Sequence, residues 1–361
     1  MQKPRLYNVI GLMSGTSLDG IDAALIRTDG LGHVDRLGFH TEDYDPALRD
    51  SLRVCLGLRS DPDGRVAMAE RAMTLAHAAA VKKLLAKAGM KAADIDLIGF
   101  HGQTVFHEPA SRFTWQIGDG ALLAKETGIP VINDFRSADV AAGGQGAPFL
   151  PLYHQAVVSS QPKPVAILNL GGVANVTYID DNGILAFDTG PASALINDWV
   201  KAATGAEYDK DGALAQAGVV DQNIVNGYLS HAYFNALPPK SLDRDQWTTK
   251  PVQGLSTADG AATLTAFTVQ SIAKARDHLP QEPKAWYVTG GGRHNKTIMA
   301  WLRAALGVPV GTVDDLQLNG DSMEAEGFAY LAARSAQGLH LSVPTTTGVP
   351  QPVTGGRKWS P

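Results

Sequence analysis

The amino-acid sequence predicts an α/β protein built from two similar domains. Short strand-like runs alternate with helical patterns along the chain. One strand–loop–strand unit occurs twice, once near the start and once near the middle of the sequence. The length of 361 residues exceeds that of a typical single domain and suits two. We therefore expect each domain to be a mixed sheet flanked by helices, with a cleft between the two domains.

The expected strands are short apolar runs bounded by Gly, Pro, Asn or Asp. They lie at residues 7–12, 23–27, 95–100, 131–133, 165–170, 175–179, 185–188 and 286–289. Apolar residues at helical spacing occupy residues 65–90, 256–279, 295–306 and 321–337. Suitable capping residues mark several helix ends, namely Ser256 with Asp259, Asn295, and Gly338 after the last pattern.

The repeated unit sets the expected domain organisation. Residues 7–27 form a strand, a Gly/Ser/Thr loop and a second strand, and residues 165–188 repeat this order. The second copy adds a third strand after an Asp-Asn-Gly turn, which is a strong hairpin signal. Two unrelated hairpins would give the same pattern. The Gly/Pro-rich stretch 141–148 is the expected boundary, which predicts domains at residues 1–145 and 146–341 and a Pro/Thr/Gly-rich tail at residues 342–361.

Composition narrows the class of protein and its partners. Hydrophobic residues make up 44% of the chain and charged residues 19%, as in globular proteins. The net charge of −5 argues against nucleic acid or an anionic membrane as the main partner. No apolar segment is long enough to span a bilayer, and no signal-peptide core precedes the first strand. Cys55 is the only cysteine, which excludes an intrachain disulfide and fits a reducing, cytoplasmic location.

A loop of small residues, hydroxyls and two acids follows the first expected strand. It reads Gly-Thr-Ser-Leu-Asp-Gly-Ile-Asp at residues 15–22. Its glycines let backbone N–H groups approach an anion, and its hydroxyls add donors. Asp19 and Asp22 would repel a phosphate unless a divalent cation lay between them. The loop is therefore interpreted as a Mg-nucleotide loop, and an ordinary hairpin turn is the alternative.

Two more glycine loops follow expected strands. Residues 171–175 read Gly-Gly-Val-Ala-Asn, and residues 290–295 read Gly-Gly-Gly-Arg-His-Asn at the start of a helical pattern. Backbone at a helix N-terminus is well placed to meet a nucleotide. Neither GxxxxGK[ST] nor GxGxxG occurs in the chain, so a nucleotide would be bound in another way.

Asp188 is the candidate general base. It ends an apolar strand-like run and precedes Thr189-Gly190-Pro191. A carboxylate at the end of a buried strand suits a base in a crevice. The alternative is an Asx-type cap of the turn or of the following helix.

Other polar residues follow strands or begin a helix. His101 and Gln103 are candidates for hydrogen bonds to a substrate or for a structural turn, and the His101–His107 spacing does not suggest zinc. Arg136 suits a substrate carboxylate, or else a salt bridge with Asp134 or Asp139. Glu324 shares a helix face with Phe328 and Leu331, which suggests a ligand hydroxyl as its partner. Alternatively, it is simply an acid favoured in the first helical turn.

Eight motifs, in order along the chain, resemble those of the anhydro-N-acetylmuramic acid kinase family. They lie at residues 15–22 (GTSLDGID), 100–104 (FHGQT), 133–136 (NDFR), 169–175 (NLGGVAN), 187–191 (FDTGP), 290–295 (GGGRHN), 321–325 (DSMEA) and 344–349 (PTTTGV). The resemblance spans nearly the whole chain, with no motif missing.

This resemblance implies an actin-like (ribonuclease H-like) fold of the sugar kinase and heat-shock ATPase superfamily, with ATP and Mg²⁺ bound between the domains. It implies the ATP-dependent conversion of 1,6-anhydro-N-acetylmuramic acid to N-acetylmuramic acid 6-phosphate in peptidoglycan recycling. It also implies a homodimer.

The resemblance then suggests a role for each candidate residue. Cofactor binding falls to Gly15, Thr16, Ser17, Leu18, Asp19, Gly20, Ile21 and Asp22 in the first phosphate loop, to Gly171, Gly172 and Asn175 in the second, and to Gly290, Gly291, Gly292 and Asn295 on the adenosine side. Asp19 and Asp22 are expected to hold Mg²⁺ through water. The substrate residues are His101, Gln103, Arg136 and Glu324.

The anhydro sugar has no free 6-hydroxyl, so ring opening and phosphorylation must be coupled. The hypothesis is that Asp188 activates a water that attacks C1, as in an inverting glycoside hydrolase, and that the released O6 attacks the γ-phosphate. One alternative is a related N-acetylhexosamine kinase, in which Asp188 would deprotonate a sugar hydroxyl. Another is an actin-like regulatory ATPase that binds a protein.

Overall fold

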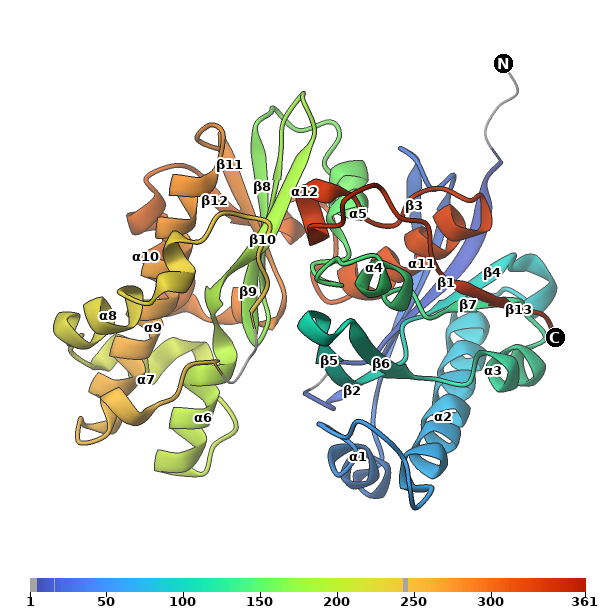
Figure 1. The fold of residues 1–361 in the computed structure, drawn as a ribbon, viewed down its shortest axis with the longest axis horizontal. Helices are drawn as coiled ribbons and strands as arrows, with labels where there is room; N and C mark the ends of the chain where they lie inside the picture. The colour runs from blue at the N-terminus through green and yellow to red at the C-terminus, as the bar shows by residue number, and fades with distance from the viewer. Residues whose placement is uncertain (1–4, 16, 243–245) are drawn as a thin grey trace. The chain divides into compact units, whose positions relative to one another are not determined.

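The computed structural model describes residues 5–15, 17–242 and 246–361. The chain forms two compact units, each drawn as a ribbon in Figure 1. Unit 1 comprises Met1–Ser160 and Ser322–Pro361, and unit 2 comprises Gln161–Asp321. This division differs from the expected domains 1–145 and 146–341 and from the expected separate tail. The helix at Met323–Ala336 and the tail belong to unit 1, because that helix packs on the sheet of unit 1.

Unit 1 contains a six-stranded sheet in the order β13-β7-β4-β1-β2-β3. Strands β1, β2 and β3 are antiparallel neighbours, β4 and β7 run parallel to β1, and β13 pairs antiparallel with β7 at the edge. The strands are β1 (Tyr7–Met13), β2 (Gly20–Thr28), β3 (Val34–Asp43), β4 (Leu97–Phe100), β7 (Val131–Asn133) and β13 (Arg357–Trp359).

Unit 2 contains a five-stranded sheet in the order β10-β9-β8-β11-β12. Its first three strands are again antiparallel neighbours, and the last two run parallel to the first. The strands are β8 (Val165–Leu170), β9 (Val173–Ile179), β10 (Ile184–Pro191), β11 (Ala285–Thr289) and β12 (Val310–Thr312). With strands numbered along the chain within each sheet, both sheets therefore share the order 3-2-1-4-5, and β13 adds a sixth strand at the edge in unit 1. This ribonuclease H-like order, present twice, confirms the predicted actin-like fold class and the predicted repeat.

Helices cover both faces of the sheet in unit 1. Ile10 and Leu12 of β1 share a core with residues of the long helix α2, whereas Gly11 between them faces helix α11. Since successive strand residues point to opposite faces, α2 and α11 lie on opposite sides. The elements are α1 (Pro46–Arg53), α2 (Arg65–Ala88), α3 (Gly120–Thr127), α4 (Ser137–Ala141), α5 (Pro151–Val157), α11 (Met323–Ala336), α12 (Pro344–Thr347), and the hairpin β5 (Gln103–Glu108) with β6 (Phe113–Ile117).

Glycines let α11 approach the sheet closely. Gly11 and Gly99 are register partners on the neighbouring strands β1 and β4. A Cβ atom at Gly11 would lie 1.8 Å from the carbonyl oxygen of Ala325, and one at Gly99 would lie 2.2 Å from that of Phe328. The backbone of α11 thus lies directly on two strands, which only residues without a side chain allow.

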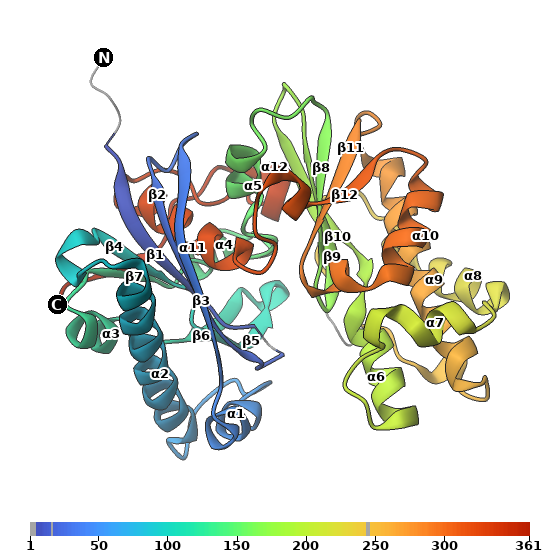
Figure 2. The same ribbon diagram turned by 180° about the vertical axis from the view of Figure 1, so that it is seen from behind.

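Helix α9 is the central helix of unit 2 and packs against α6, α7, α8 and α10 (Figure 2). Its Phe267 is buried in one core with Phe187 of β10 and Trp286 of β11. The helices are α6 (Ser193–Thr204), α7 (Ala213–Ala217), α8 (Gln222–Leu229), α9 (Thr257–Ala275) and α10 (Lys296–Leu306). Within the described parts of the chain, no helix combines the length and apolar character needed to cross a membrane.

Candidate active site

The candidate residues of unit 1 gather at one edge of its sheet. Strands β1, β4 and β7 are parallel, so their carboxyl ends meet at the same edge, where ligands bind in open α/β sheets. The loop from Ser14 follows β1, His101 follows β4, and Arg136 lies in the loop after β7.

The first glycine loop is tied to the segment after β4. The buried Ser14 hydroxyl donates to Oε1 of Gln103 at 3.1 Å, and Gln103 is fully buried. Leu18 has a φ of 57°, and its N–H donates to the carbonyl of Gly15 at 3.0 Å, which closes a tight turn. A Cβ atom at Gly15 would contact only the Ser17 hydroxyl, so the backbone there is open.

Two acids border this loop. Asp19 is exposed and Asp22, within β2, is partly buried. Thr16, which the sequence places in the same loop, lies outside the described residues. No group of three His, Cys, Asp or Glu side chains within the described ranges has the arrangement of a directly ligated metal.

His101 and Arg136 form a joined pair. The guanidinium of Arg136 lies 3.0 Å (Nη2) and 3.2 Å (Nε) from Nε2 of His101, and Nη1 donates to the Gly146 carbonyl at 2.6 Å. Burial, and then the charge of Arg136, hold the pKa of His101 well below its ordinary 6.5. The imidazole is therefore neutral, with Nδ1–H donating to the Gly102 carbonyl at 2.7 Å and Nε2 accepting from Arg136.

The remaining unit 1 candidate, Glu324, is placed differently from expectation. It is exposed in the first turn of α11, whereas Phe328 and Leu331 are fully buried, so the predicted apolar setting of Glu324 is wrong. From Ala325 to Ala333 every residue of the helix is buried, and Glu324 lies just before that region.

The buried acid of this helix is Glu326, which the sequence analysis did not single out. Its carboxylate accepts hydrogen bonds from the hydroxyls of Tyr153, on α5, and Ser322. Burial raises its pKa above the ordinary 4.5, although both hydroxyls and Arg36 act in the opposite direction.

In unit 2, the two glycine loops follow β8 and β11, which are parallel neighbours. The loop after β11 packs against the end of β8. Gly290 has a φ of 79°, and a Cβ atom there would lie 2.3 Å from Oδ1 of Asn169. A Cβ atom at Gly291 would meet nothing within 4 Å, and one at Gly171 would meet only the carbonyl oxygen of Val173, at 3.4 Å. The backbone of both loops is therefore accessible beyond the ends of β8 and β11.

Arg293 supports the second of these loops. Its buried guanidinium contacts Asp314 and Asp321, each at 2.9 Å, and donates to the carbonyl of Gly290 at 3.1 Å. Asn295 caps α10, because its Oδ1 accepts the N–H of Ile298 at 3.0 Å. The cap was predicted from the sequence, but the anchoring role of Arg293 was not.

Asp188 lies near the end of β10 and is 7% exposed. It is the register partner of Asn175 on β9, immediately before a bulge. Its Oδ2 accepts the N–H of Leu242 at 2.8 Å, and its carbonyl accepts the hydroxyl of Tyr233 at 2.6 Å. No side chain caps the N-terminus of α6, so Asp188 is not the cap of the following helix.

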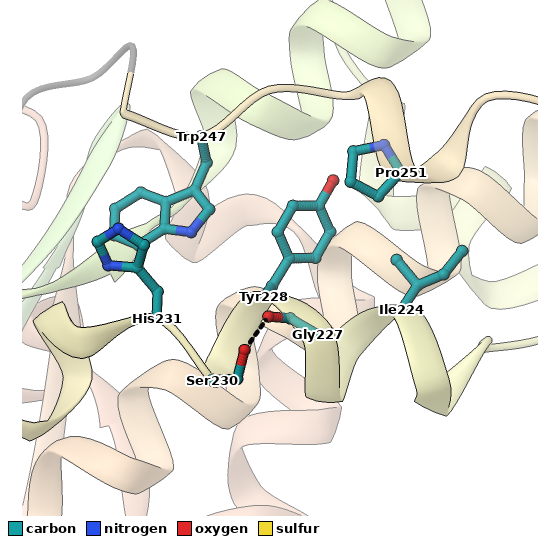
Figure 3. Close-up of a pocket in the computed structure, with 7 residues that line it drawn as sticks. All are labelled: Ile224, Gly227, Tyr228, Ser230, His231, Trp247 and Pro251. Carbon is teal, nitrogen blue, oxygen red and sulfur yellow. Dashed lines mark hydrogen bonds between the residues drawn. The ribbon is translucent and has the colours of Figure 1, made fainter.

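An apolar pocket of about 320 Å³ lies elsewhere in unit 2 (Figure 3). It is lined by Ile224, Gly227, Tyr228, Ser230, His231, Trp247 and Pro251. None of the candidate residues lines it, and its lining includes neither lysine nor arginine.

Comparison with known proteins identifies the same family as the motifs do. The family model for anhydro-N-acetylmuramic acid kinase matches residues 7–360. A protein of that name from Rhizorhabdus wittichii is 52% identical over 354 residues, covering 96% of this chain and 97% of its own. One from Paramagnetospirillum magneticum is 53% identical over 357 residues, covering 98% of this chain and 99% of its own. The chain therefore belongs to the anhydro-N-acetylmuramic acid kinase family.

Proposed function

We propose that this protein is an ATP-dependent kinase that cleaves the 1,6-anhydro bond of 1,6-anhydro-N-acetylmuramic acid and phosphorylates O6. The products are N-acetylmuramic acid 6-phosphate and ADP. The observation that carries this proposal is the match over residues 7–360 to the family model, joined by relatives of that name about as long as this chain. The proposal includes a cytoplasmic homodimer that acts in peptidoglycan recycling.

Asp188 is the proposed general base. Its carboxylate accepts a proton from water as the water oxygen attacks C1 with inversion. The C1–O6 bond breaks, and the released O6 attacks the γ-phosphorus of ATP in line with the leaving ADP oxygen. The burial of Asp188 and the N–H bond from Leu242 to Oδ2 support this role, since both restrict the carboxylate to a defined position.

The three glycine loops are the proposed nucleotide contacts. Open backbone at Gly15, Gly171 and Gly291 suits N–H bonds to phosphate oxygens and contacts to adenosine. Asp19 and Asp22 are oxygen donors, and the exposed Asp19 carboxylate suits a hydrated ion rather than a fully dehydrated one. They would hold Mg²⁺ through water, and the ion would offset the charge on the β- and γ-phosphates.

The sugar is assigned to the unit 1 edge that holds His101, Gln103 and Arg136. Arg136 is the proposed partner of the lactyl carboxylate, because a guanidinium binds a carboxylate in a planar, bidentate manner. His101 is neutral, so it orients the guanidinium of Arg136 and does not place beside it a negative charge that would compete with the carboxylate. Glu324, exposed at the start of α11, is the proposed partner of a ring hydroxyl or the amide.

The test is turnover of ATP with the anhydro sugar, comparing the wild type with Asp188→Asn. We expect the variant to lose about 10²–10⁴-fold or more in kcat, because the amide cannot accept the proton, while its affinity for the sugar is retained. In H₂¹⁸O the wild type should place the label at C1 of the product. Near-normal turnover of the variant would remove Asp188 from the role of base.

The same assay separates the alternatives. A kinase for a free N-acetylhexosamine would phosphorylate that sugar without incorporating solvent oxygen. A regulatory ATPase would hydrolyse ATP at the same rate with and without sugar. Either result would overturn the proposed reaction.

A further inference from the structure

Asp188 is held by one segment that lies between α8 and α9. The N–H of Asp188 donates to the carbonyl of Lys240 at 3.0 Å, and its carbonyl accepts the hydroxyl of Tyr233 at 2.6 Å. Its carboxylate accepts the N–H of Leu242 at 2.8 Å. The main chain on both sides of the carboxylate and the carboxylate itself are thus all bonded to residues 233–242.

Two of the residues that hold Asp188 also contact each other. Nζ of Lys240 donates to the main-chain carbonyl of Tyr233 at 2.9 Å. The same ammonium lies 4.7 Å from the centre of the Tyr233 ring and 5.7 Å from that of Phe187, the residue before Asp188. Tyr233, Lys240 and Leu242, here called the Asp188 clasp, are therefore bonded to Asp188, and the first two are also bonded to each other.

The clasp contacts β10 at the point where its pairing with β9 becomes irregular. Asp188 pairs with Asn175, but the register shifts between Asp188 and Gly190. A bulge interrupts the ladder and re-aims the side chain beside it. The Tyr233 hydroxyl and the Lys240 carbonyl, both bonded to the main chain of Asp188, therefore fix Asp188 at the point where strand pairing is interrupted.

The clasp contains the ammonium group of Lys240 and the neutral phenol of Tyr233. Burial, and then the charge of Asp188, raise the pKa of Tyr233, so its hydroxyl stays protonated and keeps donating. Burial, and then the nearby Lys274, lower the pKa of Lys240 to about 8. His278 also faces this ammonium, with Nε2 at 3.3 Å from Nζ.

We propose that Tyr233 and Lys240 are positioning residues for Asp188, which hold its main chain so that the carboxylate keeps the orientation needed to activate water. This rests on the proposed role of Asp188 as the base. A base whose orientation varies loses rate because the reacting atoms are less often aligned, even when substrate binding is unchanged. The clasp therefore affects kcat more than KM.

Tyr228, in the neighbouring helix α8, provides a matched control. It is buried, and its hydroxyl also donates to a main-chain carbonyl, that of Thr248, at 2.8 Å. Its ring stacks on Phe267 at 4.5 Å, and it lines the pocket together with Trp247 (Figure 3). Tyr228→Phe thus removes an equivalent hydrogen bond without touching Asp188.

The experiment compares kcat, KM and thermal midpoint for Tyr233→Phe and Tyr228→Phe in the full-length protein. We expect Tyr233→Phe to lower kcat by about three- to tenfold, the effect of one lost neutral hydrogen bond, with KM for ATP and sugar unchanged. Tyr228→Phe should leave kcat at the wild-type value, although both variants lose a similar amount of thermal stability. Equal kcat values in the two variants would overturn the proposal.

Lys240 gives an independent readout. We expect Lys240→Met to lower kcat, and Lys240→Arg to restore it, because arginine keeps the cation and its donors. In the wild type kcat should fall as the pH rises past about 8, where Lys240 loses its proton, and Lys240→Arg should move this fall to higher pH. If kcat falls at the same pH in the wild type and in Lys240→Arg, the role of Lys240 is contradicted.

The two proposals fail in different ways. If Asp188→Asn is inactive and Tyr233→Phe equals Tyr228→Phe, the clasp is refuted and the base is retained. If Asp188→Asn keeps its turnover, the base assignment is refuted, and the clasp proposal falls with it.

Discussion

At the scale of single residues, uncharged groups contribute to the orientation of two charged side chains. Arg136 donates to a neutral imidazole and a main-chain carbonyl. Asp188 accepts a main-chain N–H through its carboxylate and a tyrosine hydroxyl through its carbonyl. Partners of this kind fix the orientation of a side chain, which suits groups that must act on a substrate or a proton.

The positions of the candidate residues at strand ends were predictable from the sequence, whereas the residues that support them were not. Asp188 lies near the end of β10, and His101 and Arg136 follow β4 and β7, as the apolar runs before them indicated. Tyr233 was not predictable, because its bond to Asp188 joins positions 45 residues apart, which leaves no local pattern. On α11 the sequence indicated Glu324 as the acid on the apolar face, whereas Glu326 is the buried one.

Glu326 gives a prediction about stability and pH. Its raised pKa means that, from about pH 4.5 upward, the folded protein binds more protons at this site than the unfolded chain. The contribution of Glu326 to stability is therefore present below pH 4.5 and is lost as the pH rises through the folded pKa. Glu326→Gln should not lose stability in this way, because the amide cannot ionise. Its side-chain oxygen can still accept a hydrogen bond from Tyr153 or Ser322.

We expect the free energy of unfolding of Glu326→Gln, relative to the wild type, to increase between pH 4.5 and pH 7. Denaturant unfolding at several pH values measures it. Glu207→Gln is the control, because the side chain of Glu207 is 71% exposed. A difference for Glu326→Gln that stays constant with pH would contradict the prediction.

At the scale of secondary-structure elements, the strands with buried, apolar residues were predictable and the exposed ones were not. β1, β7 and β8 closely match their predicted ranges. β3 was missed because most of its residues are partly or fully exposed and polar, so it shows no clear alternation. The hairpin of β5 and β6 was missed for a similar reason, since few of its residues are buried. Hydrophobic periodicity detects burial, and these strands have little of it.

The contact of α11 with the sheet gives a prediction for Gly99. In Gly99→Ala the new methyl group would overlap the main chain of Phe328, which cannot move as a flexible side chain can. We expect a loss of about 1–3 kcal/mol or more in the free energy of unfolding, as for other overpacked cores. Gly32→Ala is the control, because a Cβ atom there meets nothing within 4 Å. Denaturant unfolding compares the variants, and equal losses would show that α11 does not press on β4.

At the scale of the whole molecule, the chain completes unit 1 only with its last forty residues. α11 covers one face of the sheet, and β13 adds an edge strand beside β7. The buried Asp139 accepts hydrogen bonds from Ser342 and Thr347 in the tail and from the N–H of Gly146. The sequence predicted contiguous domains because nothing local indicates that residues about 200 positions apart are bonded.

This arrangement predicts how fragments of the chain behave. Residues 161–321 contain a complete sheet with its own core, so this fragment should fold alone and unfold cooperatively. Residues 1–160 lack α11, and their sheet would expose the face that includes Gly11 and Gly99 to water. We therefore expect the 1–160 fragment to lack cooperative unfolding, and a chain that joins 1–160 to 322–361 through a flexible Gly/Ser linker to recover it. Thermal unfolding followed by circular dichroism measures all three. A cooperative transition in 1–160 alone would mean that the sheet of unit 1 is stable without α11, β13 and the tail, because residues 322–361 supply the layer and the edge strand that complete unit 1.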